Sequence, residues 1–246
     1  MSAFSRPAAT AHPAVPSTPH PLRRREPPHL LFAVLAAVHL AALLGGALEG
    51  ADTLAHLTKP ALMPVLAAYV LACGGPRPLV AALLFGCGGD TLLQIGGDTV
   101  FLLGMGCFAA GHICYLTLFL RNRRRIPPPL AAGYAAAWLG TVALLWPGLP
   151  SDMRGPVAVY SLLLTAMALG ALYAGPVALA GGALFLLSDT LIATDIADWP
   201  QAPLPHFWVM LTYLAAQYAL ARGVLHTHQA REASPTPAHG EARAAG

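Results

Sequence analysis

Charged residues are scarce in this sequence. Only 10% of the 246 residues are Asp, Glu, Lys or Arg, whereas a typical soluble domain has about 25%. Hydrophobic residues of the AVILMFWYC set make up 56% of the chain. So few charges cannot cover the surface of a water-soluble fold, and a soluble globular enzyme, a disordered chain and a nucleic-acid-binding protein all fit poorly. The composition is typical of a polytopic membrane protein.

Cysteine is scarce as well. The four cysteines, Cys73, Cys87, Cys107 and Cys114, lie within or at the edge of apolar stretches. Their spacing matches no disulfide framework and no metal-binding motif. We therefore expect them to pack as small hydrophobic side chains, and we predict no metal and no other cofactor.

Long apolar stretches are what the sequence has in abundance. A helix needs about 20 apolar residues to cross the hydrocarbon core of a bilayer. The second stretch opens on Lys59-Pro60, which suits a helix start because proline fits the first turn and a terminal lysine can reach the headgroups. The predicted spans are 30–48, 57–73, 78–95, 100–120, 130–146, 156–172, 176–194 and 206–225. We predict an all-α, polytopic bundle of eight transmembrane helices over 30–225, flanked by flexible tails at 1–29 and 226–246.

The positions of the basic residues predict the orientation of the bundle. If the N-terminus is cytoplasmic, twelve arginines face inward and only Lys59 and Arg154 face outward. The outer loops instead carry acids: Glu49, Asp52, Asp98, Asp152, Asp195 and Asp198. We predict that both termini are cytoplasmic. The alanine- and arginine-rich, lysine-poor composition favours a bacterial inner membrane.

Two carboxylates lie inside the predicted spans. Asp90 is in the third span and Asp189 in the seventh, and each is followed by Thr-Leu. An ionisable residue within the bilayer is costly and indicates a functional site, the alternative being a structural contact between helices. The two segments lie 99 residues apart and resemble each other, which suggests a parallel duplication of a four-helix unit. Their matched depth, nearer the outer face, would let them meet across a shared cavity.

Other polar residues of the spans share helix faces. His112 and Tyr115, three residues apart, lie on one side of the fourth span, and Tyr213 and Gln217, four apart, on one side of the eighth. His112 either contacts a neighbouring helix or takes a direct part in catalysis, and Tyr213 and Gln217 either contact a neighbouring helix or line a polar cavity.

Residues beside the two carboxylates have alternative interpretations too. The glycines Gly86, Gly88 and Gly89 before Asp90 let a helix or an acyl chain approach closely. Ser188 either hydrogen-bonds within the site or bonds back to its own helix. Lys59, the single lysine, either anchors its helix at the outer interface or pairs with a lipid phosphate or an aspartate.

This ordered set of motifs resembles the YhhN-like family, which includes the TMEM86 lysoplasmalogenases. The motifs are Lys59-Pro60, Gly89-Asp90, Gly111-His112 with Tyr115, Ser188-Asp189, and Tyr213 with Gln217, spread over roughly residues 55–220. The resemblance implies an eight-helix membrane hydrolase that cleaves the vinyl ether bond of lysoplasmalogens, with Asp90 and Asp189 as the catalytic pair. We predict that Lys59, His112, Tyr115, Ser188, Tyr213 and Gln217 bind the substrate.

The residues agree with vinyl ether hydrolysis, which begins with proton transfer to carbon and therefore needs a carboxylic acid. Burial and a nearby second carboxylate both favour the protonated form of such a group. The other aspartate, ionised, would stabilise the cation and position or deprotonate water; the sequence leaves open which is which. Because the substrate is amphipathic, we expect a cavity open sideways to lipid, with the headgroup near Lys59.

Three other functions fit part of the pattern. A proton-coupled transporter also uses intramembrane aspartates and repeats, but the spans holding Asp90 and Asp189 contain no helix-breaking proline. Intramembrane aspartyl proteases carry Gly-x-Gly-Asp, whereas Cys87 stands at the first glycine position here. A structural or lipid-sensing bundle would have no catalytic use for the pair. The transporter is the main alternative, and the predicted partners are lysophospholipid and membrane lipids, with no nucleic acid.

Overall fold

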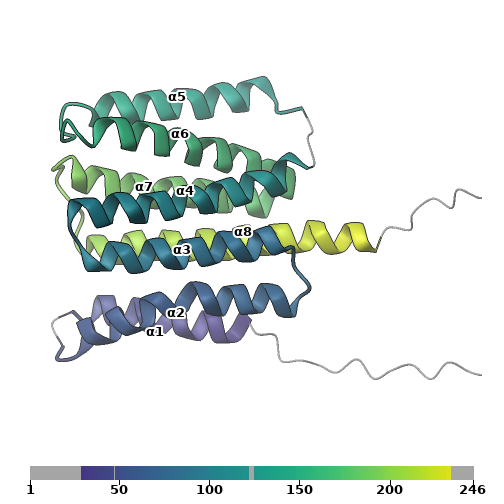
Figure 1. The fold of residues 1–246 in the computed structure, drawn as a ribbon, viewed down its shortest axis with the longest axis horizontal. Coiled ribbons are helices and arrows are strands. Elements are labelled where there is room, and N and C mark those ends of the chain that lie inside the picture. The colour runs from purple at the N-terminus through teal and green to yellow at the C-terminus, as the bar shows by residue number, and fades with distance from the viewer. Residues whose placement is uncertain (1–28, 47, 122–124, 234–246) are drawn as a thin grey trace, which may run out of the picture.

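The computed structural model describes residues 29–46, 48–121 and 125–233, and within these ranges every regular element is a helix. Consecutive helices run back and forth, and the start of α1 and the end of α8 lie at the same end of the bundle (Figure 1). The helices are α1 (His29–Leu44), α2 (Ala51–Ala72), α3 (Arg77–Ile95), α4 (Asp98–Leu120), α5 (Pro128–Leu145), α6 (Arg154–Gly170), the short 3₁₀ helix η1 (Ala171–Ala174), α7 (Pro176–Ile196) and α8 (Pro205–Glu232). The predicted all-α bundle is confirmed.

The two ends of the bundle differ in charge. We call the end with the α1–α2, α3–α4, α5–α6 and α7–α8 connections the acidic end, because Asp98, Asp152, Asp195 and Asp198 lie there. The opposite end is the basic end. That the acidic end faces outward, with cytoplasmic termini, stays a prediction. Part of the basic set on which that prediction depends lies outside the described residues: Arg6, Arg23, Arg24, Arg25, Arg123, Arg124 and Arg243.

Six of the helices are long and apolar enough to cross a membrane: α2, α3, α4, α5, α6 with η1, and α7. Helix α1 is apolar but shorter, with 16 residues. Helix α8 has 28 residues, which corresponds to a length of about 42 Å. This helix content is that of a polytopic membrane bundle, as predicted.

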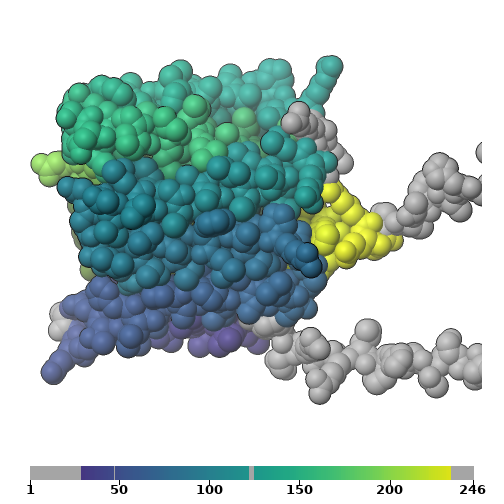
Figure 2. All heavy atoms as spheres, viewed as in Figure 1, coloured from purple at the N-terminus to yellow at the C-terminus, as the bar shows by residue number. Residues whose placement is uncertain are grey.

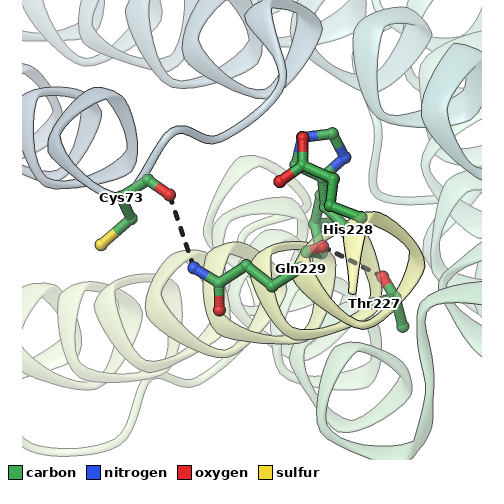
Figure 3. A network of polar contacts seen from close by, with 6 residues as sticks. Cys73, Thr227, His228 and Gln229 are labelled. Carbon is green, nitrogen blue, oxygen red and sulfur yellow. Dashed lines mark hydrogen bonds and ion pairs between the residues drawn. The ribbon is translucent and has the colours of Figure 1, made fainter. Parts of the chain in front are cut away.

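The boundary predicted for the C-terminal tail is wrong by seven residues. Helix α8 continues past 225 to Glu232, and these polar turns project from the bundle at the basic end (Figures 1 and 2). Gln229 Nε2 donates to the Cys73 carbonyl at the end of α2, at 3.4 Å (Figure 3). His228 and Glu232 pair one turn apart, at 3.3 Å. Residues 1–28 and 234–246, the rest of the predicted tails, lie outside the described residues.

Helix α2 begins at Ala51, so Lys59-Pro60 lies inside the helix and not at its start, contrary to prediction. A proline lacks the N–H that would bond the carbonyl four residues earlier, so Pro60 and Pro64 free two carbonyl oxygens. Helix α3 bonds both: Gln94 Nε2 donates to the His56 carbonyl at 3.4 Å, and Cys87 Sγ donates to the Pro60 carbonyl at 3.2 Å. Hence α2 crosses the bundle despite two internal prolines, because its neighbour hydrogen-bonds the exposed backbone.

Small residues set the spacing of α7 against its neighbours. A Cβ added at Gly181 would lie 2.8 Å from the Leu220 backbone nitrogen on α8, and one at Gly182 would lie 2.8 Å from Ala168 Cα on α6. Between apolar helices in lipid, close backbone approach of this kind is a main source of attraction. The crossing of α7 with α8 fixes the positions of the polar residues that both helices carry.

The first prediction concerns this crossing. Replacing Gly181 with alanine forces α7 and α8 apart, and we expect a loss of about 1–3 kcal/mol of stability. Thermal unfolding in detergent measures it. Gly140→Ala is the matched control, because a Cβ at Gly140 on α5 meets nothing within 4 Å. Equal unfolding temperatures for the two variants would contradict the proposed packing.

Candidate functional site: a carboxylate pair in an internal cavity

A cavity of about 230 Å³ lies within the bundle, between α2 on one side and α5 and α6 on the other. Most of its wall is apolar or aromatic, with Phe101 and Phe108 from α4 and Trp138 from α5. The polar residues on the wall include Lys59, Asp90, Tyr160, Ser188, Asp189 and Tyr213. The cavity thus brings together the two aspartates that the sequence singled out.

Asp90 is held by a chain of hydrogen bonds that runs across three helices. Tyr213 of α8 donates its hydroxyl hydrogen to Asp90 Oδ2 at 2.9 Å. Gln217 Nε2, one turn further along α8, donates to the Tyr213 hydroxyl at 3.3 Å. Tyr115 of α4 donates in turn to Gln217 Oε1 at 2.7 Å. Every donor in this chain points toward Asp90, so Oδ2 acts only as an acceptor.

Asp189 has a parallel arrangement built from α6 and α4. The Tyr160 hydroxyl donates to Asp189 Oδ2, and His112 Nε2 lies 3.1 Å from the same hydroxyl. Because Tyr160 has a single hydroxyl hydrogen and gives it to Asp189, His112 must donate through Nε2. His112 and Tyr115 therefore share a face of α4, as predicted, but serve different aspartates.

The aromatic ring of Phe185 on α7 connects the two networks. It packs edge-on against His112, with ring centroids 4.9 Å apart, and against Tyr213 at 5.5 Å. Phe185 is 1% exposed, so a fixed apolar spacer separates the polar groups that hold Asp90 from those that hold Asp189.

The glycines before Asp90 admit neighbouring helices, as one of the two sequence interpretations proposed. A Cβ at Gly86 would lie 3.0 Å from the Tyr213 hydroxyl and 3.3 Å from Gln217 Nε2. At Gly89 it would lie 2.6 Å from the Phe108 ring. Glycine at these positions lets α8 and α4 bring their polar and aromatic side chains against Asp90.

The two carboxylates lie at similar depth but differ in exposure. Asp90 is five residues before the end of α3, and Asp189 seven before the end of α7. At 1.5 Å per residue these positions are about 8 Å and about 10 Å from the acidic end. Asp90 is 4% exposed, whereas Asp189 is half-buried on the cavity wall. A molecule in the cavity therefore reaches Asp189 more easily.

The contacts of two other predicted residues bear on the alternatives that the sequence left open. Ser188 donates to the Val209 carbonyl of α8 at 3.0 Å, so it joins two helices and does not bond back to its own. Lys59 lines the cavity from inside α2, within electrostatic reach of Asp90. Among the described residues, no group of three or more His, Cys, Asp or Glu side chains is arranged to hold a metal ion.

Sequence reasoning missed Tyr160, although it supplies the hydrogen bond to Asp189. The sequence does show Tyr160 as a lone tyrosine inside the apolar sixth span. Its polar neighbour Ser161 lies on a different helix face, so the two do not form a pair three or four residues apart of the kind that drew attention to the other spans. The structure places Ser161 instead as the acceptor for Trp138 Nε1, at 3.1 Å.

Together, the fold and the cavity define a polytopic helical membrane protein with a carboxylate pair in its interior. The profile of the YhhN family matches residues 54–224. The chain belongs to the YhhN family, which confirms the resemblance that its motifs indicated.

Named relatives agree with this assignment. Lysoplasmalogenase TMEM86B of Homo sapiens is 34% identical over 154 residues, which are 63% of this chain and 66% of the relative. Lysoplasmalogenase of Mycobacterium bovis is 30% identical over 208 residues, 78% of each chain. Lysoplasmalogenase TMEM86B of Sus scrofa is 35% identical over 170 residues, 66% of this chain and 72% of the relative. No solved structure matches the chain.

The second prediction tests the Asp90 network. Tyr213→Phe removes the hydroxyl that donates to this buried carboxyl group, and we expect a loss of about 1–3 kcal/mol of stability. Tyr173→Phe is the control, because the Tyr173 hydroxyl makes no hydrogen bond within the described ranges. Thermal unfolding of both variants in detergent measures this loss. An unfolding temperature of Tyr213→Phe equal to that of the wild type would contradict the network.

Proposed function

We propose that this protein hydrolyses the vinyl ether bond of lysoplasmalogens, releasing a fatty aldehyde and a glycerophospho-base. The observation that carries the proposal is the pair Asp90 and Asp189 on the wall of one largely apolar cavity. The names of the relatives, all lysoplasmalogenases, support the substrate class. An amphipathic ether lipid suits a cavity with aromatic walls and two carboxyl groups.

The reaction needs one carboxylic acid and one carboxylate. The acid transfers its proton to the second carbon of the alkenyl chain, which leaves an oxocarbenium ion at the first carbon. The ionised carboxylate stabilises this cation, accepts a proton from water, and the resulting hydroxide adds to the first carbon. The product of this step is a hemiacetal, and the two carboxyl groups have exchanged protonation states.

The second half of the reaction restores both groups. The aspartate that gave its proton now takes the hemiacetal hydroxyl proton, while the other returns a proton to the glycerol oxygen. The bond between carbon and that oxygen breaks, giving the aldehyde and the free glycerol hydroxyl. The balance is one vinyl ether and one water consumed, and both carboxyl groups return to their starting forms.

We assign the initial acid to Asp189 and the ionised carboxylate to Asp90. Asp189 is the more accessible of the two, and the group that protonates carbon must touch the chain. Asp90 is buried, and the Lys59 ammonium on the same cavity wall stabilises a negative charge there. Tyr160 and Tyr213 hold the two carboxyl groups in place.

The packing of α5 supports entry of the substrate from the bilayer. Helices α4 and α5 follow each other in the chain, but among the described helices the backbone of α5 comes close to those of α6 and α7 and not to that of α4. Both α4 and α5 contribute side chains to the cavity wall, among them Phe108 and Tyr134. We therefore propose that a lysolipid enters sideways between these two helices.

The third prediction is the direct test of the function. Purified protein in detergent should release a long-chain aldehyde from a 1-alkenyl lysophospholipid, and Asp90→Asn and Asp189→Asn should each lower that rate at least ~100-fold. Asp195→Asn is the control, an exposed acid at the end of α7 that should keep the wild-type rate.

Two outcomes would overturn the proposal. Aldehyde release that persists undiminished in both variants would exclude the aspartate mechanism. Absence of aldehyde from the wild type, together with proton-linked solute uptake in liposomes, would assign the protein as a transporter.

The fourth prediction concerns Tyr160 as a positioning residue. Tyr160→Phe removes the hydroxyl that donates to Asp189 and so leaves this carboxyl group without its fixed orientation. We expect kcat to fall by about tenfold while KM changes less. Steady-state kinetics on the same substrate separates the two constants, with Tyr173→Phe as control. A change confined to KM would show that Tyr160 contacts the substrate and does not position Asp189.

A further inference from the structure

Arg154 is a second cation on the cavity wall, and no role has been assigned to it. It is the first residue of α6, at the acidic end of the bundle, and it is half-buried. It lines the same cavity as Asp90 and Asp189. Of the basic residues that the structure describes, only Lys59 and Arg154 do so.

The side chain of Arg154 is held in place while its charge stays available. Its Nε donates to the Leu149 carbonyl at 3.2 Å, and its guanidinium carbon lies 5.7 Å from the centre of the Trp146 ring. No carboxylate within the described ranges pairs with it. The two terminal nitrogens of a guanidinium form a planar fork that matches the oxygens of a phosphate.

The offset along α6 between Arg154 and the tyrosine that bonds Asp189 is close to the distance from the phosphorus to the vinyl ether in a lysoplasmalogen. Tyr160, the partner of Asp189, lies six residues after Arg154 on α6, a rise of about 9 Å. In a lysoplasmalogen, six bonds separate the phosphorus from the vinyl ether carbon that water attacks, or about 7 Å when extended. A guanidinium side chain easily covers the difference.

The position of Lys59 makes it less suited to this task. It lies eight residues inside α2, about 12 Å from the acidic end. This is near the level of the two aspartates and not at the acidic end, where Arg154 lies. The sequence placed the headgroup near Lys59; the structure offers Arg154 at the depth where the phosphate would lie.

We propose that Arg154, held against Trp146, binds the phosphodiester of the lysolipid headgroup and so sets the vinyl ether at the depth of the aspartates. The proposal rests on the proposed function for the bond that is cleaved, but phosphate recognition is itself a binding property. Arg154 then makes the protein selective for ether lipids that carry a phosphate.

The test compares two vinyl ether substrates with the same chain, 1-alkenyl-glycerophosphocholine and 1-alkenylglycerol, which has no phosphate. Arg154→Gln should raise KM for 1-alkenyl-glycerophosphocholine by about 10- to 100-fold, the loss expected for a hydrogen-bonded charge. KM and the rate for 1-alkenylglycerol should stay unchanged, and this unchanged rate shows that the variant is folded. Arg154→Lys, which keeps a charge without the fork, should give an intermediate KM.

Arg222→Gln is the matched control. Arg222 also lies over an aromatic ring, with its guanidinium carbon 5.9 Å from the centre of Tyr218, but it is exposed on α8 and does not line the cavity. This variant should keep the wild-type preference for the phosphate-bearing substrate. Equal losses on both substrates in Arg154→Gln, or no loss on either, would overturn the proposal.

A binding measurement separates failure of this proposal from failure of the proposed function. The probes are an acyl lysophosphatidylcholine and a monoacylglycerol, neither of which has a vinyl ether, and tryptophan fluorescence reports their binding. Suppose that the wild type cleaves no vinyl ether but binds the lysophosphatidylcholine more tightly than the monoacylglycerol. If Arg154→Gln then binds the two probes equally, the phosphate site stands without the proposed function. If cleavage occurs and Arg154→Gln binds both probes as the wild type does, the phosphate site is excluded and the function remains.

A soluble competitor identifies the source of the phosphate. Glycerophosphocholine carries the phosphodiester without a chain, and it should inhibit the wild type but not Arg154→Gln. Inorganic phosphate at the same concentration should not inhibit. Stronger inhibition by inorganic phosphate than by glycerophosphocholine would assign Arg154 to free phosphate and overturn the lipid headgroup proposal.

Discussion

A carboxyl group inside a membrane-spanning bundle needs hydrogen-bond partners, because the hydrocarbon offers none. Two such groups, Asp90 and Asp189, therefore constrain most of the surrounding structure. Each accepts a hydrogen bond from a tyrosine hydroxyl on another helix. Each tyrosine hydroxyl in turn accepts a hydrogen bond from a further buried side chain, Gln217 or His112. These bonds join helices α3, α4, α6, α7 and α8, and glycines on α3 and α7 allow the close approach of these helices that the bonds require.

The cavity lies where tightly packed helices meet a loosely packed one. Helices α7 and α8 cross closely at Gly181, while α5 buries a single residue, Leu145, and leaves its opposite side to the bilayer. The proposed lipid hydrolysis needs both properties, since rigid helices would hold the two proposed catalytic aspartates and a loosely attached helix would admit a long chain. The same contrast explains why the cavity lies between the carboxylates and α5.

The sequence predicted the bundle well because hydrocarbon thickness selects apolar segments of a particular length. It also isolated the two aspartates, since so few charges lie away from the ends. It misplaced the start of α2, whose first turns carry polar residues such as Asp52 and His56 and resemble a loop. It missed Tyr160 and the cavity role of Arg154, because contacts between helices depend on how each helix is rotated about its axis. Composition and spacing leave that rotation undetermined.

The central claim is that the bond is broken by proton transfer to carbon from a buried carboxylic acid. The most direct test is to run the reaction in D₂O, with the aldehyde reduced at once to the alcohol, and to measure deuterium by mass spectrometry. The account predicts one deuterium on the second carbon of the chain, because the solvent supplies the proton that Asp189 transfers. Product without deuterium at that carbon would contradict it.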